Sequence, residues 1–400
     1  MNDLAPVTSI PQLEADPFDL ANILDPYDFH EQLRETGAVV YVEKYDTYAV
    51  GRHAEVRSVL SDWETFTSTA GAGLSDIRKP GGWREPGPLV EADPPLHTSR
   101  RGVVSKIISP KIIKSWQRTY AAGAADLVAR LCDQQDVDGA RDIAEAFVIE
   151  NFPASLGLEP HRENMVIVGN FNFNALGPKN ALFEQSARQL ESISEWFNAV
   201  QGREGITPGS FSEQVYDAED AGELEEGVAR GLVRTVLRGG MDTTISGIAS
   251  TIRIMSERPE FWAKLRQDRS KLKLIFDEVI RLETPIQSWY RTTTREVTLG
   301  DFRLEADKKI QVFAGSANRD PRRWERPDEF DITRSAAGHL AFGQGIHLCI
   351  GQLIARMEAE SVLNALLDRI ERIEPAGVPT YRPLNTMRTL QTLPLRLIPA

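Results

Sequence analysis

The stretch that decides the fold is Phe342-Gly-Gln-Gly-Ile-His-Leu-Cys349-Ile-Gly-Gln-Leu-Ile-Ala-Arg356. Three glycines crowd the loop around Cys349, and a run rich in Ala, Leu, Ile and Met follows at helical spacing. A thiol placed there lies over the first turn of a helix, where free backbone N–H groups and the helix dipole favour thiolate. Glycine also lets a loop fold closely around a sulfur and a flat ligand. The alternative, an ordinary buried cysteine, leaves the glycines, Phe342 and Arg356 unexplained.

The same stretch resembles the haem-binding loop of cytochromes P-450, F-x-x-G-x-x-x-C-x-G-x-x-x-A-R, and every fixed position is matched. The resemblance implies haem b as cofactor and Cys349 as the thiolate ligand of its iron. It implies that Phe342, Gly343 and Gly351 shape the loop against the haem. It also implies a mainly α fold with small β-sheets, in a single haem domain over 16–400 that follows a flexible segment over 1–15.

Composition bounds the class of protein. The 400 residues are 41% hydrophobic and 26% charged, which is typical of a globular protein. No apolar run long enough to span a membrane and no apolar leader is visible, so we expect a cytoplasmic protein without a membrane segment. The net charge of −12 disfavours nucleic acid and anionic membranes as partners. Two cysteines cannot form a disulfide framework, and Cys132 is expected in the core.

Local patterns predict helices with a few strands. Residues 37–43 and 47–50 are β-rich runs separated by a polar turn, which predicts a hairpin, and a helix is expected over 53–60. Residues 68–95 hold many Gly and Pro without a period, so they predict a long loop of the kind that covers a binding site. Helical patterns dominate from about 110 to 270, and strands rich in Thr and aromatic residues follow Pro285.

A long central helix is predicted from about 227 to 255, and it contains Gly239 and Gly240 ahead of Asp242 and Thr243. An interior glycine costs about 1 kcal/mol relative to alanine, so the pair indicates either a kink or room for a flat ligand and a small gas molecule. The segment resembles the family's oxygen-binding helix, A/G-G-x-D/E-T-T. The resemblance implies that Asp242 and Thr243 are the catalytic acid–alcohol pair, which delivers protons during oxygen activation.

Cationic side chains are expected around the haem propionates. His97 and Arg101 are four residues apart and share a helix face, which in isolation indicates a surface pair. The resemblance implies that both bind haem propionates together with Arg291 and His347, because cationic donors suit carboxylates.

A second charged group has a scaffold role. Glu278 and Arg281 are close enough on one helix to pair, and such pairs at a surface are weak. Their spacing fits the family's E-x-x-R motif, which a later arginine joins. Arg334, at the end of Pro327-Asp-Glu-Phe-Asp-Ile-Thr-Arg334, supplies it here.

The substrate pocket resembles that of soluble bacterial members that oxidise para-substituted benzoates, in which arginine and serine hold the carboxylate and phenylalanines sandwich the ring. Four departures stand out: Gly87 replaces a loop serine, Thr235 replaces a helix serine, and Leu176 and Trp289 each replace a phenylalanine. Arg84 and Arg234 are either the anchor of the carboxylate or solvated side chains that bind a bulk anion. Thr235, Gly239 and Thr243 recur every four residues and so lie near one helix face. The pocket residues implied are Arg84, Phe173, Leu176, Arg234, Thr235, Gly239, Ile286 and Trp289.

These observations predict a haem-thiolate monooxygenase that uses O2 and two electrons from a ferredoxin, itself reduced by an NAD(P)H-dependent ferredoxin reductase. The expected substrate is a small aromatic molecule, a para-substituted benzoic acid first, with hydroxylation or O-demethylation as the reaction. A phenol, terpenoid or natural-product intermediate is the alternative substrate. Three other classes remain open: a peroxide-driven haem enzyme, a haem protein without turnover, and a cysteine hydrolase that uses Cys349 with His347.

Overall fold

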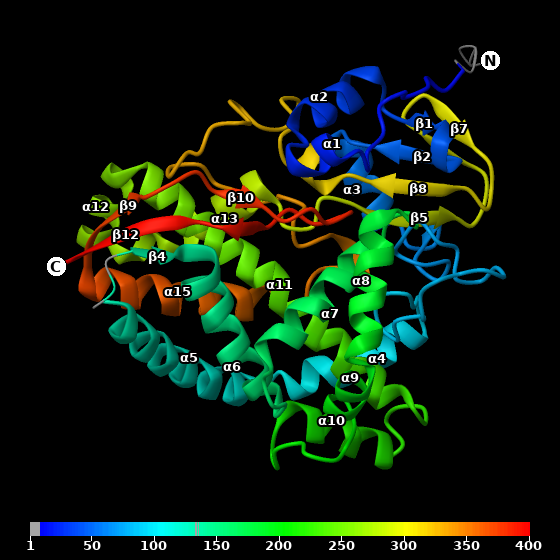
Figure 1. Cartoon of the computed structure of the whole chain (residues 1–400). Helices are drawn as coiled ribbons and strands as arrows, with labels where there is room; N and C mark the ends of the chain where they lie inside the picture. The colour runs from blue at the N-terminus through cyan, green and yellow to red at the C-terminus, as the bar shows by residue number, and fades with distance from the viewer. Residues whose placement is uncertain (1–8, 133, 135) are drawn as a thin grey trace.

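The helical part of the molecule is built around α11 (Val228–Glu257), a helix of 30 residues that runs through its centre (Figure 1). In the computed structural model, which describes residues 9–132, 134 and 136–400, α11 packs against helices on several sides. Leu232, Val233, Leu237 and Met241 are buried along it, so an apolar stripe at helical spacing places the helix in the core. Its main helical neighbours are α6 (Ala146–Leu156), α7 (Arg162–Asn174), α10 (Phe211–Asp220), α13 (Leu272–Glu283) and α15 (Gln352–Arg369).

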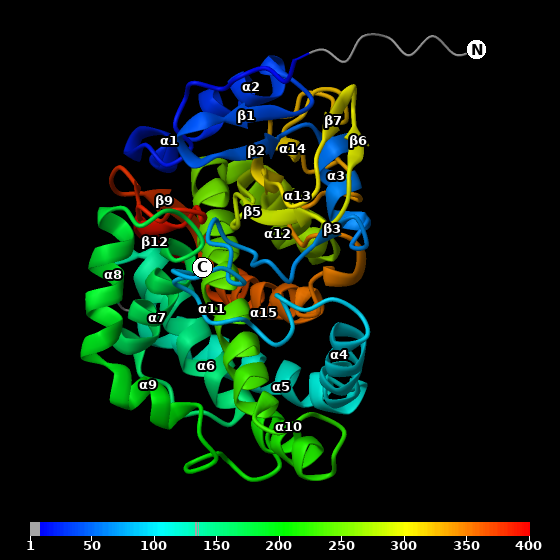
Figure 2. The same ribbon diagram turned by 90° about the vertical axis from the view of Figure 1, so that its right-hand side faces the viewer.

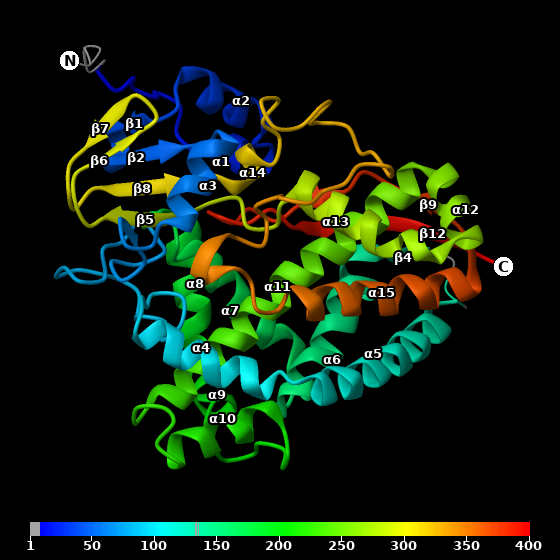
Figure 3. The same ribbon diagram turned by 180° about the vertical axis from the view of Figure 1, so that it is seen from behind.

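The other helices extend this core. α15 runs alongside both α11 and the 22-residue helix α5 (Pro110–Leu131), as Figure 3 shows with α15 in orange and α5 in teal. The remaining helices are α1 (Leu20–Leu24), α2 (Tyr27–Thr36), α3 (His53–Ser61), α4 (Leu96–Ile107), α8 (Ala181–Ser192), α9 (Ser194–Val200), α12 (Pro259–Gln267) and α14 (Ala314–Ala317). No helix within the described ranges combines the length and the hydropathy that a bilayer crossing requires.

The largest sheet has five strands in the order β1-β2-β8-β5-β3 and lies above the helical core in Figure 2. Its strands are β1 (Val40–Val42), β2 (Thr47–Val50), β3 (Phe66–Thr67), β5 (Trp289–Thr293) and β8 (Lys309–Val312). β2 pairs with β8 in parallel, whereas the other neighbours are antiparallel. Three smaller sheets join β4 (Asp136–Asp138), β12 (Pro394–Pro399) and β9 (Ile370–Pro375), then β6 (Val297–Leu299) with β7 (Phe302–Leu304), and β10 (Thr380–Tyr381) with β11 (Leu390–Thr392).

The expected mainly α fold with small sheets is confirmed. The hairpin is β1 and β2, with Tyr41 opposite Tyr48, and the expected helix over 53–60 is α3. Of the segment expected to be flexible, residues 1–8 lie outside the described residues. Leu13 is buried and its backbone N–H donates to the Tyr41 carbonyl at 2.9 Å, so packed chain begins before residue 16.

Candidate active site

The loop before α15 holds Cys349 in a fixed geometry. Gly343 and Gly345 adopt φ of 73° and 68°, the left-handed region that only glycine enters without strain. A Cβ at Gly345 would also lie 2.5 Å from the Leu60 carbonyl oxygen, so α3 packs directly against the loop. The Cys349 backbone N–H donates to the Phe342 carbonyl at 2.8 Å, and the Arg356 guanidinium stacks 4.8 Å from the Phe342 ring. The fixed positions of the sequence motif therefore contact one another and hold the loop in one conformation.

The thiol of Cys349 lies at the start of α15, as its position in the sequence predicts. Burial raises its pKa, while the backbone N–H groups of Gly351 and Gln352 and the charges of Arg101 and Arg356 lower it. The N–H groups at the start of the helix favour thiolate as predicted, whereas burial opposes it. A metal ion that coordinates a thiol deprotonates it outright, and the donors around Cys349 then stabilise the resulting charge.

The four expected propionate-binding residues gather beside this loop. The rings of His97 and His347 are 4.5 Å apart, and Arg101 Nη2 donates to the Leu348 carbonyl at 2.6 Å. His347 Nε2 lies 3.0 Å from Ser68 Oγ, and burial lowers its pKa. His97 Nε2 is buried and finds no hydrogen-bond partner within the described residues, and burial with the charge of His347 lowers the pKa of His97 to about 4.

Arg291, on β5, completes the cluster and is buried. Its guanidinium donates to the Tyr290 carbonyl at 2.8 Å but forms no salt bridge with any residue that the structure describes. Burial lowers the pKa of Arg291 to about 10. Two arginines and two histidines with unused donors make a site that a pair of ligand carboxylates would satisfy.

The face of α11 around Gly239 is open. Within residues 231–256, all of which the structure describes, Gly239 is the single exposed position, and a Cβ there would meet no atom within 4 Å. Thr243, one turn on, is partly exposed and donates from Oγ1 to the Gly239 carbonyl at 2.8 Å. Gly240 differs, because a Cβ there would lie 2.3 Å from Phe152 Cζ. Only Gly239 therefore makes room for a ligand, whereas Gly240 permits close helix packing.

Asp242 is buried on the side of α11 that faces α7. Its carboxylate occupies the space where Gly169 lacks a side chain, since a Cβ at Gly169 would lie 2.2 Å from Asp242 Oδ1. Asp242 Oδ2 has no hydrogen-bond partner in the described part of the chain, and burial raises the pKa of Asp242 to about 7. Gly169 could not be predicted, because its role depends on two helices crossing at this point.

The scaffold group forms a buried network behind the loop. Arg281 donates to both carboxylate oxygens of Glu278 at 2.8 and 2.9 Å, and both side chains are fully buried. Arg334 Nε donates to Glu278 Oε1 at 2.9 Å. The three residues thus meet, and their burial makes the pair far less exposed to solvent screening than a surface ion pair.

A separate apolar cluster joins the end of α7 to the long loop and to the segment between β10 and β11. Phe173 and Leu176 pack there with Ala72, Leu384 and Met387, and Ile286 packs against the cluster from the segment before β5. Trp289, expected beside them, packs instead against the core cluster of the five-stranded sheet. The predicted aromatic wall is therefore formed by Phe173 with aliphatic neighbours.

The long loop meets the first half of α11. A Cβ at Gly87 would lie 4.0 Å from Thr235 Oγ1 and 2.4 Å from Glu91 Oε2. Arg84 Nη2 pairs with Glu91 Oε1 at 3.2 Å, and Arg234 Nη1 pairs with Glu85 Oε2 at 2.8 Å. The two arginines predicted to hold a carboxylate thus lie at one place, but each already contacts a carboxylate of the protein.

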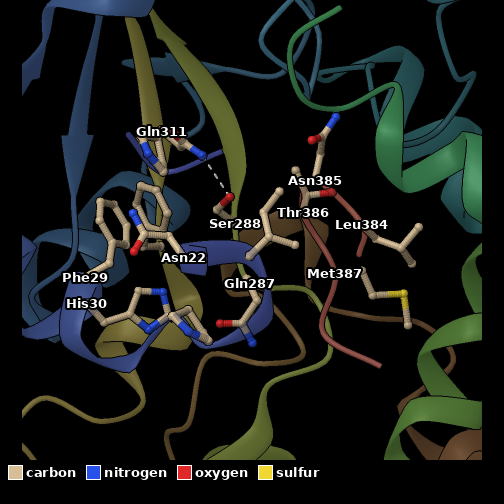
Figure 4. Close-up of a pocket in the computed structure, with 14 residues that line it drawn as sticks. Asn22, Phe29, His30, Gln287, Ser288, Gln311, Leu384, Asn385, Thr386 and Met387 are labelled. Carbon is tan, nitrogen blue, oxygen red and sulfur yellow. Dashed lines mark hydrogen bonds between the residues drawn. The ribbon is translucent and has the colours of Figure 1, made fainter. Parts of the chain in front are cut away.

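A small enclosed pocket lies apart from these residues (Figure 4). It shares Leu384 and Met387 with the apolar cluster, and its polar side chains include His30, Gln287 and Gln311. Its volume of about 20 Å³ suits one water molecule and is far too small for a substrate. None of the residues that the sequence assigns to a site lines it.

A thiol beside two arginines and two histidines that can donate to carboxylates, with a central helix opened at one glycine, fits haem b with a cysteine ligand. Fold and site together define a haem-thiolate protein of the oxygen-activating class.

Comparisons with known proteins agree. Residues 208–397 match the family model of cytochrome P450. The chain is 43% identical to cytochrome P450 CYP199A2 of Rhodopseudomonas palustris over 99% of this chain and 98% of that protein. It is 28% identical to the beta-dihydromenaquinone-9 omega-hydroxylase of Mycobacterium tuberculosis, covering 96% of this chain and 78% of the relative. The solved structure of CYP109Q5 from Chondromyces apiculatus superposes with a TM-score of 0.80 at 29% identity, over 97% of this chain and 99% of that one.

The chain belongs to the cytochrome P450 family. It is a monooxygenase, and its cofactor is haem b bound through a cysteine thiolate.

Proposed function

We propose that this monooxygenase oxidises a small aromatic carboxylic acid, and that a para-methoxybenzoate is O-demethylated. The observation that carries the proposal is the meeting of the long loop and α11, where Gly87, Thr235 and the arginines Arg84 and Arg234 come together. Thr235 lies roughly 12 Å along the helix axis from Thr243. A carboxylate held near Thr235 leaves room for one ring and a para substituent beside the open face at Gly239.

The residues of the chain have distinct roles in this proposal. When bound, the haem supplies the activation of O2 and the insertion of one oxygen atom into a C–H bond. Cys349 holds the iron, and His97, Arg101, Arg291 and His347 hold the propionates. The apolar cluster around Phe173 excludes water and orients the ring.

Proton supply is assigned to α11. With a pKa raised to about 7, Asp242 both gives and takes a proton at neutral pH. The Thr243 hydroxyl, on the open face, orders the water through which that proton passes. A methoxyarene, O2, two electrons and two protons then give a phenol, formaldehyde and water. We propose that a ferredoxin, reduced by an NAD(P)H-dependent reductase, delivers the electrons in the cytoplasm.

A different small substrate is the second candidate, and two departures favour it. Gly87 lacks the hydroxyl that a loop serine would offer to a carboxylate, and Leu176 replaces an aromatic wall with an aliphatic one. A phenol, terpenoid or natural-product intermediate would suit such a pocket. A peroxide-driven enzyme is disfavoured by the presence of Asp242 and Thr243. A non-catalytic haem protein would bind ligands and accept electrons without turnover.

The test uses the ferric holoenzyme and a panel of para-substituted benzoic acids, their amides, phenols and terpenoids. We expect the acids to shift the iron from low to high spin, and 4-methoxybenzoate to yield formaldehyde with a surrogate ferredoxin system. No spectral shift and no formaldehyde with any methoxylated acid would reject the aromatic-acid proposal. A shift with the neutral compounds alone would favour the second candidate.

A further inference from the structure

Arg238 lies on α11 between the two regions described above, one turn beyond Arg234. Its guanidinium stacks 4.9 Å from the ring of Phe197, which α9 contributes. Arg238 Nε is buried and has no hydrogen-bond partner in the part of the chain that the structure describes. Long helical side chains lean toward the N-terminus of their helix, so the charge of Arg238 points back toward Arg234 and the long loop.

The surrounding charges do not neutralise Arg238. The groups that act on it are two arginines, Arg234 and Arg84, and two glutamates, Glu85 and Glu91. Each glutamate is paired with one of those arginines, at 2.8 and 3.2 Å. Burial and the two neighbouring arginines lower the pKa of Arg238 to about 9, so it remains protonated at neutral pH. Three cations therefore share two anions at this place.

A second unused donor is present in the same group. Arg84 Nη1 is buried and, like Arg238 Nε, makes no hydrogen bond to any described residue. Buried guanidinium donors left unpaired cost considerable free energy, and an anion that accepts from both would recover it. The loop and the helix that carry these two arginines are the ones that meet at Gly87 and Thr235.

We infer that Arg238, together with the free Nη1 of Arg84, binds the carboxylate of the substrate and sets the preference for an anionic aromatic acid. The inference deepens the proposed function and rests on it. It replaces Arg234 as the expected anchor, because Arg234 is paired with a glutamate whose side chain is 80% exposed, at the outer edge of the group. Arg238 acts as a binding residue of the substrate pocket.

A packing role is the competing explanation, since the arginine stem and guanidinium also cover Phe197. Loss of packing would weaken the binding of every ligand or destabilise the holoenzyme, without regard to ligand charge. Loss of an anion site would weaken only the binding of acids. The ratio between the dissociation constants of an acid and of its neutral amide separates the two explanations.

The experiment titrates ferric holoenzyme with 4-methoxybenzoate and with 4-methoxybenzamide, following the spin-state change. The variants are Arg238→Gln, Arg238→Met, which keeps an apolar stem over Phe197, and Arg238→Lys, which keeps the charge. The control is Arg230→Gln, which removes an exposed arginine of the same helix that donates to Asn198. We expect Gln and Met to weaken acid binding roughly 10-fold to 100-fold with the amide unchanged, Lys to restore part of the loss, and the control to behave as wild type.

The outcomes separate this inference from the proposed function. If wild type prefers the acid and both neutral variants keep that preference, Arg238 is not the anchor while the aromatic-acid function stands. If acid and amide binding weaken equally, the residue has only a packing role. If wild-type enzyme binds the amide at least as tightly as the acid, the anionic substrate class fails and the inference fails with it.

Discussion

Replacing Asp242 with asparagine tests the proton-supply role and the electrostatics of the site in one variant. The carboxylate is buried against Gly169, and its Oδ2 has no partner among the described residues, so the ionised form is poorly solvated. Asparagine has nearly the same shape and cannot ionise. The substitution therefore removes the charge and the transferable proton while it preserves the packing of α7 on α11.

The pH dependence of stability follows from the raised pKa. A carboxyl whose pKa rises from 3.8 to about 7 on folding holds its proton more tightly in the folded state. Stability is thus full at low pH and falls as pH rises from about 4 to about 7. Each pKa unit is about 1.4 kcal/mol, so wild type loses on the order of 2 to 3 kcal/mol between pH 5 and pH 8 that Asp242→Asn does not lose. For a chain of 400 residues this is about 3 °C in Tm.

Two measurements on holoenzyme check this reasoning. The Tm difference between variant and wild type should grow by about 3 °C from pH 5 to pH 8, and O2-dependent product formation should fall about 100-fold or more. Glu358→Gln is the matched control, because Glu358 on α15 is also fully buried with both oxygens unpaired to any described residue and burial raises its pKa. The Tm of Glu358→Gln relative to wild type should also rise with pH, because wild type alone loses stability, while its activity should be kept. A pH-independent Tm difference for Asp242→Asn, or unchanged turnover, would refute the argument.

Six further substitutions have defined outcomes. Thr243→Ala should divert electrons to hydrogen peroxide at the expense of product, measured as the peroxide-to-product ratio, and Thr243→Ser should restore coupling; equal ratios would contradict the role of the hydroxyl. Cys349→Ser should abolish the carbonyl adduct spectrum that is characteristic of thiolate ligation, whereas Cys132→Ser should retain it. Gly240→Ala should lower the free energy of unfolding by about 1 to 3 kcal/mol through overpacking, measured as a lower Tm. Gly239→Ala should leave the free energy of unfolding unchanged or raise it by up to about 1 kcal/mol. It should instead disturb the spin-state shift that ligands induce.

Much of the architecture could be predicted because its signals are local in sequence. Gly343 and Gly345 in the Cys349 loop adopt left-handed conformations. Because such conformations favour glycine, the loop can be recognised from its glycines in the sequence. The alternating runs of β1 and β2 and the apolar spacing of α11 are local in the same sense. The central helix predicted from about 227 to 255 is therefore found as α11, Val228–Glu257.

The details of the pocket depend on contacts between distant segments and could not be predicted. Two such details depend on the course of the long loop, which has no periodic pattern. Glu91 folds back onto Arg84, and Arg238 remains without a counter-ion among the described residues. The side chain of Trp289 packs against the core of the five-stranded sheet. Side chains of a strand alternate between its two faces, so a shift of one residue in register would move Trp289 to the other face.

The five-stranded sheet has a consequence for biosynthesis. β2 and β8 pair in parallel, with Tyr48 beside Ile310. The hairpin of β1 and β2 is therefore synthesised long before the strand that pairs with β2. Until the ribosome has released residues beyond 312, the edge of β2 stays uncovered, and exposed strand edges are prone to aggregate. Chaperone dependence during expression is therefore expected to last from the synthesis of β2 until β8 emerges, and to end in the last quarter of synthesis.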